Sequence, residues 1–151
     1  MTAISTFLET LKGDLEQSIA QSGLDASGRI SRSLRIEEDE TTGTLFGWKW
    51  IEVRTEYGRR PTSPNAPKGN PTLREAILAW VERKGIGEAK DRKSIAYLIS
   101  RKIHQQGDRL YRGELGIQPP TGVLTSVIND GRIEQLKKEI VIELFSELRK
   151  N

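Results

Sequence analysis

The sequence predicts an α+β fold in which a small antiparallel sheet packs against long N- and C-terminal helices, with a pair of helices in the centre. Apolar residues recur at steps of three and four near both ends of the chain. Between residues 33 and 48, two short apolar stretches flank an acidic turn, which is typical of a hairpin. With 151 residues, 35% of them hydrophobic, the chain can bury one core, and we expect a single domain over residues 1–151.

The first helix is predicted over residues 2–21 and ends at Ser22-Gly23, where glycine can adopt the left-handed cap conformation. Such a helix is about 30 Å long at 1.5 Å per residue. It must therefore lie along a sheet, another helix or a neighbouring subunit. Its apolar stripe consists of Ile4, Phe7, Leu8, Leu11, Leu15 and Ile19.

A hairpin follows. Residues 33–38 alternate in polarity, the acidic run of residues 37–40 leads into a turn, and residues 44–48 form the second strand. The acidic run lacks the ligand spacing of a calcium loop, so we do not expect a metal there. Residues 48–57 fit either a strand or a short helix, and periodicity leaves both open. The tryptophans Trp48 and Trp50 lie among aliphatic residues, which favours packing over base stacking.

Two helices are predicted in the centre of the chain. The first begins at the capping-box pair Thr72 and Glu75 and ends at Gly85. The second covers residues 89–106, and we expect the two to run antiparallel. His104, the single histidine, has no partner set for a general base or a ligand, so we expect a histidine at the surface or at a helix end.

The C-terminal region, residues 124–148, is predicted to be helical with a kink at Asn129-Asp130-Gly131. Its stripe has near-heptad spacing. This surface either docks on the sheet opposite the first helix or is shared with a neighbouring subunit. The stripe consists of Ile133, Leu136, Ile140, Leu144 and Leu148.

Two irregular segments, residues 58–71 and 108–120, are candidate contact surfaces. The first contains four prolines, which remove backbone donors and stiffen an extended chain. Loops of this length in compact domains are usually functional or disordered. The candidate residues for contact with another subunit or partner are Arg59, Arg60, Pro61, Pro64, Lys68, Tyr111 and Arg112.

The composition argues against catalysis. Cysteine is absent, which excludes disulfides, thiolate metal sites and cysteine nucleophiles. Carboxylate pairs such as Glu37 and Asp39 have no nucleophile, base or metal set beside them, so we expect neither an enzyme nor a cofactor. The N-terminus lacks the pattern of a signal peptide, and no stretch reaches the roughly 18 apolar residues of a membrane span. We therefore expect a protein that is made in the cytoplasm and has no membrane partner.

Charge is unevenly distributed. The segment from Arg54 to Arg112 has 14 basic and 6 acidic residues, a net charge of +8, whereas the remainder has 10 basic and 15 acidic residues, a net charge of −5. A positive face suits nucleic acid, because phosphate neutralisation drives sequence-independent binding. Opposite charges can also steer copies of one chain into head-to-tail contact. Solvated helix faces that are basic without a partner are the third interpretation.

The order of these motifs resembles the tail-completion or neck proteins of long-tailed bacteriophages, the minor tail proteins of the head–tail joining region. The resemblance covers most of the chain, although each motif is short. The motifs are the leading helix, Asp25-Ala26-Ser27-Gly28-Arg29 before Ser33-Leu34, Glu56-Tyr57-Gly58-Arg59-Arg60-Pro61, Ile77-Leu78-Ala79-Trp80-Val81 with Lys84-Gly85-Ile86, and Ser94-Ile95-Ala96-Tyr97-Leu98-Ile99 with Ile103.

This resemblance implies a structural virion protein, made in the host cell cytoplasm, that forms a homo-oligomeric ring between the portal and the tail tube. Its partners would be copies of itself and other connector, neck and tail-tube proteins, with weak contact to packaged DNA. The loop of residues 58–71 would reach a neighbour or the adjoining ring. The extra prolines and the segment from Tyr111 to Pro120 depart from the commoner form of the family. The alternative is a nucleic-acid-binding module that uses Arg59, Arg60, Lys68, Lys90, Arg92, Lys93, Arg101 and Lys102.

Overall fold

The computed structural model describes residues 2–25 and 27–149. The chain forms two compact units. Unit 1 comprises Met1–Glu56 and Pro120–Asn151, and unit 2 comprises Tyr57–Pro119. Four long helices and a two-stranded antiparallel sheet make this an α+β protein with N- and C-terminal helices, as predicted. The single domain stays a prediction.

Helix α1, Ala3–Ser22, is the centre of unit 1. The Thr2 hydroxyl accepts the Ser5 N–H at 3.1 Å and caps its start. Gly23 ends it with φ 67°, which confirms the predicted glycine cap. The apolar stripe builds the core together with residues that follow in the chain. The buried members of this core are Leu11, Leu15, Ile19, Ile30, Leu34 and Val127.

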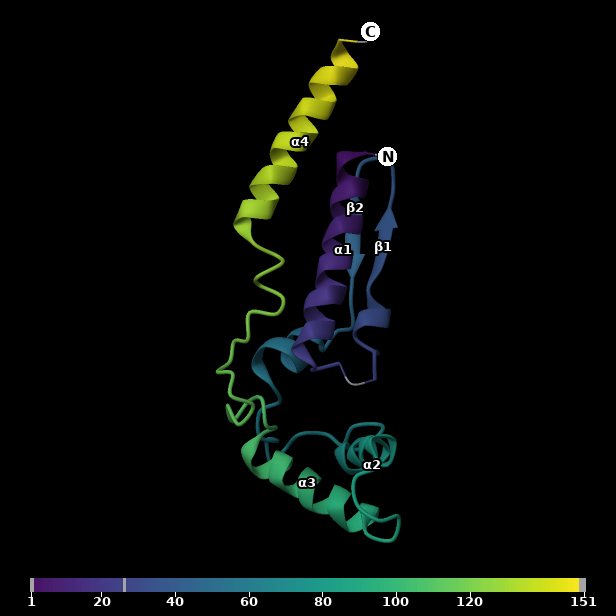
Figure 1. Cartoon of the computed structure of the whole chain (residues 1–151), viewed down its shortest axis with the longest axis vertical. Coiled ribbons are helices and arrows are strands. Elements are labelled where there is room, and N and C mark those ends of the chain that lie inside the picture. Colours follow the sequence, from purple (N-terminus) through teal and green to yellow (C-terminus); the bar gives the residue numbers. More distant parts are fainter. Residues whose placement is uncertain (1, 26, 150–151) are drawn as a thin grey trace. The chain divides into compact units, whose positions relative to one another are not determined.

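The predicted hairpin is present, with shorter strands. A 3₁₀ turn, η1 (Ser31–Ser33), precedes β1 (Arg35–Glu38), which pairs with β2 (Gly43–Phe46). Ile36 lies opposite Leu45, and both side chains are half-buried. The hairpin lies along α1, with α4 on another side of the same helix (Figure 1). The N-terminal helix is therefore the element on which both the sheet and the last helix pack.

Most of the segment that the sequence left ambiguous, residues 51–57, is helical. Residues 51–52 lead into a π-helix, η2 (Val53–Tyr57). Within it, Thr55 and Glu56 are buried and bind the chain near Thr121: the Thr121 hydroxyl donates to the Thr55 carbonyl at 2.6 Å, and the Thr121 N–H donates to the Glu56 carbonyl at 3.1 Å. These contacts with a distant segment, rather than periodicity, select the helical form.

Helix α4 spans Asp130–Leu148. The expected kink at residues 129–131 is wrong, because the helix begins at Asp130. The Asn129 side chain caps this start by accepting the Arg132 N–H at 3.1 Å. Residues 122–128 form tight turns instead. The helix packs on α1 and not on the sheet opposite α1. Leu136 and Ile140 are half-buried, while the other stripe residues are exposed.

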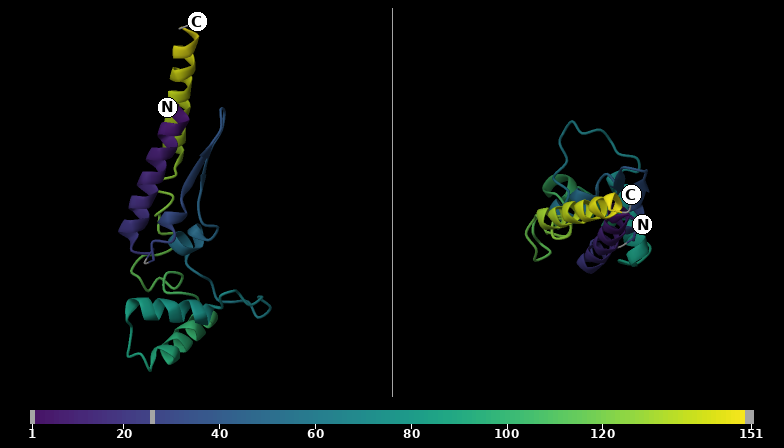
Figure 2. Two further views of the ribbon diagram at one scale, coloured as in Figure 1. Left: turned by 90° about the vertical axis from the view of Figure 1, so that its right-hand side faces the viewer. Right: turned by 90° about the horizontal axis from the view of Figure 1, so that it is seen from above.

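Unit 2 contains α2 (Leu73–Lys84) and α3 (Arg92–Gln106). The capping box between Thr72 and Glu75 is confirmed, as is the Gly85 cap with φ 63°. The expected antiparallel arrangement is wrong: Figure 1 views α2 nearly along its axis and α3 across its axis, and Figure 2 also shows the two crossing. Val81 and the small residue Ala96 are fully buried in unit 2, and small residues let helices approach closely where they cross.

Candidate assembly surfaces

The first residues of the proline-rich loop are fastened within unit 2. The Asp108 carboxylate accepts the N–H of Arg59 at 2.9 Å and the N–H of Tyr111 at 2.9 Å. Further along, the Thr62 N–H donates to the His104 carbonyl at 2.9 Å, and the Thr62 hydroxyl lies 2.7 Å from Nδ1 of His104. His104 is exposed in the last turn of α3, as predicted. The loop therefore starts from a defined position beside α3.

The remainder of the loop is exposed. Every residue from 63 to 70 is solvent-exposed, including Pro64 and Lys68, and so are Arg60 and Pro61 just before it. In the left view of Figure 2 this segment extends away from α2 and α3. The peptide bond between Asn70 and Pro71 is cis. Five of the seven residues proposed from the sequence thus lie on one stretch of loop, with the side chain of Arg59 half-buried.

The other two proposed residues lie in the segment of residues 108–120. Tyr111 is 42% exposed and so is available to a partner. Arg112 binds within its own chain: its guanidinium donates to both carboxylate oxygens of Glu114 at 2.7 and 2.9 Å and to the Gly107 carbonyl. The pKa of Arg112 is raised, chiefly by its hydrogen bonds to Glu114, and that of Glu114 is lowered to about 2, chiefly by its hydrogen bonds to Arg112. Arg112 therefore organises this turn.

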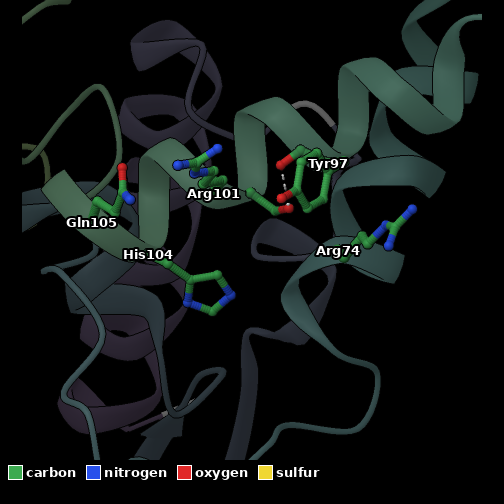
Figure 3. A pocket seen from close by; sticks show the side chains of 6 residues that line it. Arg74, Tyr97, Arg101, His104 and Gln105 are labelled. Atoms are coloured by element: carbon green, nitrogen blue, oxygen red, sulfur yellow. Dashed lines mark hydrogen bonds between the residues drawn. The ribbon is translucent and has the colours of Figure 1, made fainter.

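A basic groove lies between α2 and α3. It is an open depression of about 340 Å³ lined by Arg74 on α2 and by Tyr97, Ser100, Arg101, His104 and Gln105 on α3 (Figure 3). The Arg74 guanidinium lies 5.3 Å from the centre of the Tyr97 ring, a cation–π contact. The Ser100 hydroxyl donates to the Tyr97 carbonyl at 2.9 Å, so it belongs to the helix rather than to a ligand site. The groove presents cationic groups around an aromatic ring.

Sequence reasoning placed Arg101 and His104 on an exposed surface but did not assign Arg74 or Tyr97 to any site. The i, i+4 spacing of Tyr97 and Arg101 on one helix was visible in the sequence. The contribution of Arg74 depends on how α2 crosses α3, and no residue pattern encodes that crossing. Only the structure brings these side chains together.

An apolar face of α4 is the third surface. Ile142, Phe145 and Leu148 are exposed by 68%, 62% and 72%, and Val141 and Leu144 by about half. On the opposite side of the helix, the Ala3 N–H donates to the Glu143 carboxylate at 2.8 Å, and Arg132 pairs with Asp14. Polar contacts therefore hold α4 to α1, while most of its large apolar side chains face solvent. Large exposed apolar patches are uncommon on monomeric proteins, which makes this face a candidate contact surface.

The two units carry opposite charge. Unit 2 has 13 basic and 6 acidic residues, a net charge of +7, and unit 1 has 11 basic and 15 acidic residues, a net charge of −4. The charge segregation seen along the sequence therefore follows the division of the folded chain. Two copies can attract each other by placing unit 1 of one copy against unit 2 of the other.

Within residues 2–25 and 27–149, no cluster of three or more His, Cys, Asp or Glu side chains is arranged to hold a metal ion. Asp39, in the acidic run, instead closes the hairpin turn: the hydroxyl of Thr42 and the N–H groups of Thr41 and Thr42 donate to it and lower its pKa to about 2. None of the helices in the described part of the chain is long and apolar enough to span a membrane.

Comparisons with protein-family models, curated proteins and solved structures found no match to this chain. Three exposed surfaces and the opposite charges of the two units are the structural features on which a functional proposal can rest. The three surfaces are the loop of residues 60–70, the groove between α2 and α3, and the apolar face of α4.

Proposed function

We propose that this chain is a structural subunit that assembles with copies of itself into a ring in the neck of a long-tailed bacteriophage, between the portal and the tail tube. The motif order supports the phage assignment, and the exposed surfaces support assembly. The proposal includes no catalytic role, no cofactor and no membrane partner.

The exposed apolar face of α4 is the observation that carries the proposal. Monomeric proteins rarely expose contiguous apolar patches of more than a few hundred Å². Five large apolar side chains of α4, each roughly half exposed or more, lie within eight residues of one another. A helix with this face in water gains free energy when another protein surface covers it.

The loop of residues 60–70 supplies a second kind of contact. Its prolines limit the conformations that it loses on binding, so an extended, pre-stiffened loop docks at a lower entropic cost than a flexible one. Arg60 and Lys68 give it positive charge. In the proposed ring this loop reaches a neighbouring subunit or the adjoining ring.

The test is the molar mass of the purified protein, measured by light scattering over a range of protein concentrations at 50 and 500 mM salt, with and without duplex DNA. We expect a defined multimer whose mass rises with concentration and is indifferent to DNA. A chain that stays monomeric at every concentration and salt would contradict the proposal.

Binding to nucleic acid is the second candidate, and the basic groove favours it. Arg74, Arg101 and His104 line the groove together with Tyr97, in a unit of net charge +7, which suits a phosphate backbone with an adjacent base. A monomer that gains mass only with DNA, and loses it between about 50 and 200 mM salt, would support this candidate instead.

A further inference from the structure

We propose that copies of this chain join head to tail: the C-terminal end of α4 in one copy docks on the groove between α2 and α3 of the next. This inference rests on the proposed self-assembly and identifies the two surfaces that meet. The partner of each surface is a second copy of the chain.

The end of α4 has nothing of its own α1 to pack on. Helix α1 begins at Ala3, and the N–H of Ala3 already binds Glu143. The turn of α4 after Glu143 therefore lies past the end of α1, as Figure 1 shows. Leu144, Phe145 and Leu148 lie in this turn and are exposed by 55%, 62% and 72%. Val141 and Ile142, exposed by 48% and 68%, continue this apolar surface along the helix.

The groove offers apolar surface of matching character. Tyr97 is 45% exposed in the groove and Leu98 is 61% exposed beside it. Leu98 shares a helix face with Arg101 and Gln105, because these residues follow it by three and seven positions. A phenylalanine or leucine side chain from α4 can therefore contact Tyr97 and Leu98 while staying close to the cationic rim.

The charges of the two helices are complementary. Helix α3 carries four cationic residues and no carboxylate, whereas α4 carries five carboxylates and three cationic residues, so their net charges are +4 and −2. Glu147 lies in the last turn of α4, beside Arg149, whereas Glu143 binds the Ala3 N–H on the side that faces α1. Opposite charges at the edge of an interface steer association and penalise wrong pairings. The net negative charge of α4 thus suits the Arg74 and Arg101 side of the groove.

The same charges disfavour the simplest alternative, in which the α4 helices of two copies pair with each other. That contact would join two helices of net charge −2 and leave the basic groove uncovered. A two-fold contact of this kind also closes at a dimer, whereas a contact between two different surfaces continues from copy to copy and forms a ring when the rotation closes. Head-to-tail docking covers both surfaces.

Two variants test the contact. Phe145→Gln with Leu148→Gln removes the apolar end of α4 while keeping good helix formers, and Arg101→Glu reverses the charge of the groove. Each is expected to raise the Kd of self-association at least about tenfold, as loss of a central contact does. The matched controls are Ile128→Gln, which removes an exposed apolar side chain next to α4, and Arg83→Glu, which reverses an exposed charge on α2. Circular dichroism checks that each variant is folded.

Mixing the two variants separates head-to-tail docking from α4 pairing. Each variant keeps one intact surface, so their mixture should form a heterodimer in sedimentation velocity, while each variant alone stays monomeric. If Arg101→Glu alone still forms dimers, and mixing it with the other variant produces no additional dimer, the α4 helices pair with each other and the inference is wrong. It also fails if both variants assemble like the wild type.

The outcome for the wild type distinguishes this inference from the proposed function. A wild-type chain that is monomeric at all concentrations overturns both. A wild-type multimer that neither variant weakens overturns the head-to-tail contact alone. If Arg101→Glu leaves assembly intact but abolishes binding of duplex DNA at 50 mM salt, the groove is a nucleic-acid site and not a docking site.

Discussion

The Asp108 carboxylate accepts a hydrogen bond from the Arg59 N–H at 2.9 Å, across a separation of 49 positions in the chain. Its second oxygen accepts the Tyr111 N–H at 2.9 Å, and the Asp108 N–H itself donates to the Arg59 carbonyl at 2.9 Å. One side chain thus joins the base of the proline-rich loop to the turn after α3. The position from which the loop projects depends on this residue.

Replacing Asp108 by alanine should lower the free energy of unfolding by about 1–3 kcal/mol, because two backbone donors lose a charged acceptor. Amide hydrogen exchange at Arg59 and Tyr111 should accelerate. Urea unfolding and exchange measured by NMR give both quantities. Asp91→Ala is the control, since Asp91 is exposed and its side chain does not cap α3. Equal losses in the two variants would contradict the role of Asp108.

Gly58 and Gly116 form a matched pair for a second prediction, because both have φ of 76°. A Cβ at position 58 would lie 2.3 Å from the backbone nitrogen of Tyr111, which cannot move aside, whereas a Cβ at position 116 would meet nothing within 4 Å. Gly116→Ala should lower the free energy of unfolding by only about 1–2 kcal/mol, the cost of holding alanine in the left-handed conformation. Gly58→Ala adds the overlap, for a total of about 2–5 kcal/mol. Thermal unfolding of both variants compares them, and similar melting temperatures would show that the chain relaxes around position 58.

Glu56 is the most buried carboxylate among the described residues, at 1% exposure. It accepts the N–H groups of Gly122 at 2.8 Å and Thr125 at 3.2 Å, and also that of Leu124. Glu56→Gln keeps the shape but places an amide NH₂ against backbone donors, so we expect a loss of about 2–4 kcal/mol in unfolding free energy. Glu52→Gln, at an exposed position one turn earlier, should cost almost nothing. Denaturant unfolding measures both losses. If Glu56→Gln leaves the unfolding free energy unchanged, the turn of residues 121–125 does not depend on the charge of this carboxylate.

The sequence predicts well those features that depend on neighbouring residues. The N-terminal helix, its Gly23 cap and the capping box at Thr72 and Glu75 are confirmed, because helix periodicity and capping act within one or two turns. The hairpin is also found, with strands two residues shorter at the ends nearest the core. There, the Asp25 carboxylate accepts the N–H groups of Ile30 and Ser31 and stabilises the turn that precedes β1.

Features that depend on distant residues were not predictable. The helical form of residues 51–57 follows from the contacts that Thr55 and Glu56 make with residues 121–125, which are more than 60 positions away. The crossing of α2 and α3 brings Arg74 to Tyr97, and neither helix alone specifies it. For the same reason, the sequence named the loop residues of the candidate site but not the groove. The apolar stripe of α4 was visible in the sequence. Which part of the stripe packs and which part is exposed depends on where α1 begins, and the contact of Ala3 with Glu143 shows this only in the structure.

The ion pair of Glu114 with Arg112 predicts a pH dependence of stability. The pKa of Glu114 is lowered from its usual 4.5 to about 2 in the folded chain, first by its hydrogen bonds to Arg112 and also by the charges of Arg112 and Lys102. The unfolded chain therefore binds a proton at a higher pH than the folded chain does. Between pH of about 4.5 and 2, the stabilisation from Glu114 is lost progressively as the pH falls, and above this window it is fully present.

Glu114→Gln removes this titration. The difference in unfolding free energy between the wild type and Glu114→Gln should be constant above pH of about 5 and should shrink steadily toward pH 2. Chemical unfolding at a series of pH values measures this difference, with Glu82→Gln, at an exposed position on α2, as the matched control. Because the Glu114 side chain is open to solvent, the difference should also be smaller at 500 mM salt than at 50 mM salt. A difference that does not change between pH 5 and pH 2 would show that the Arg112 pair does not stabilise the carboxylate in solution.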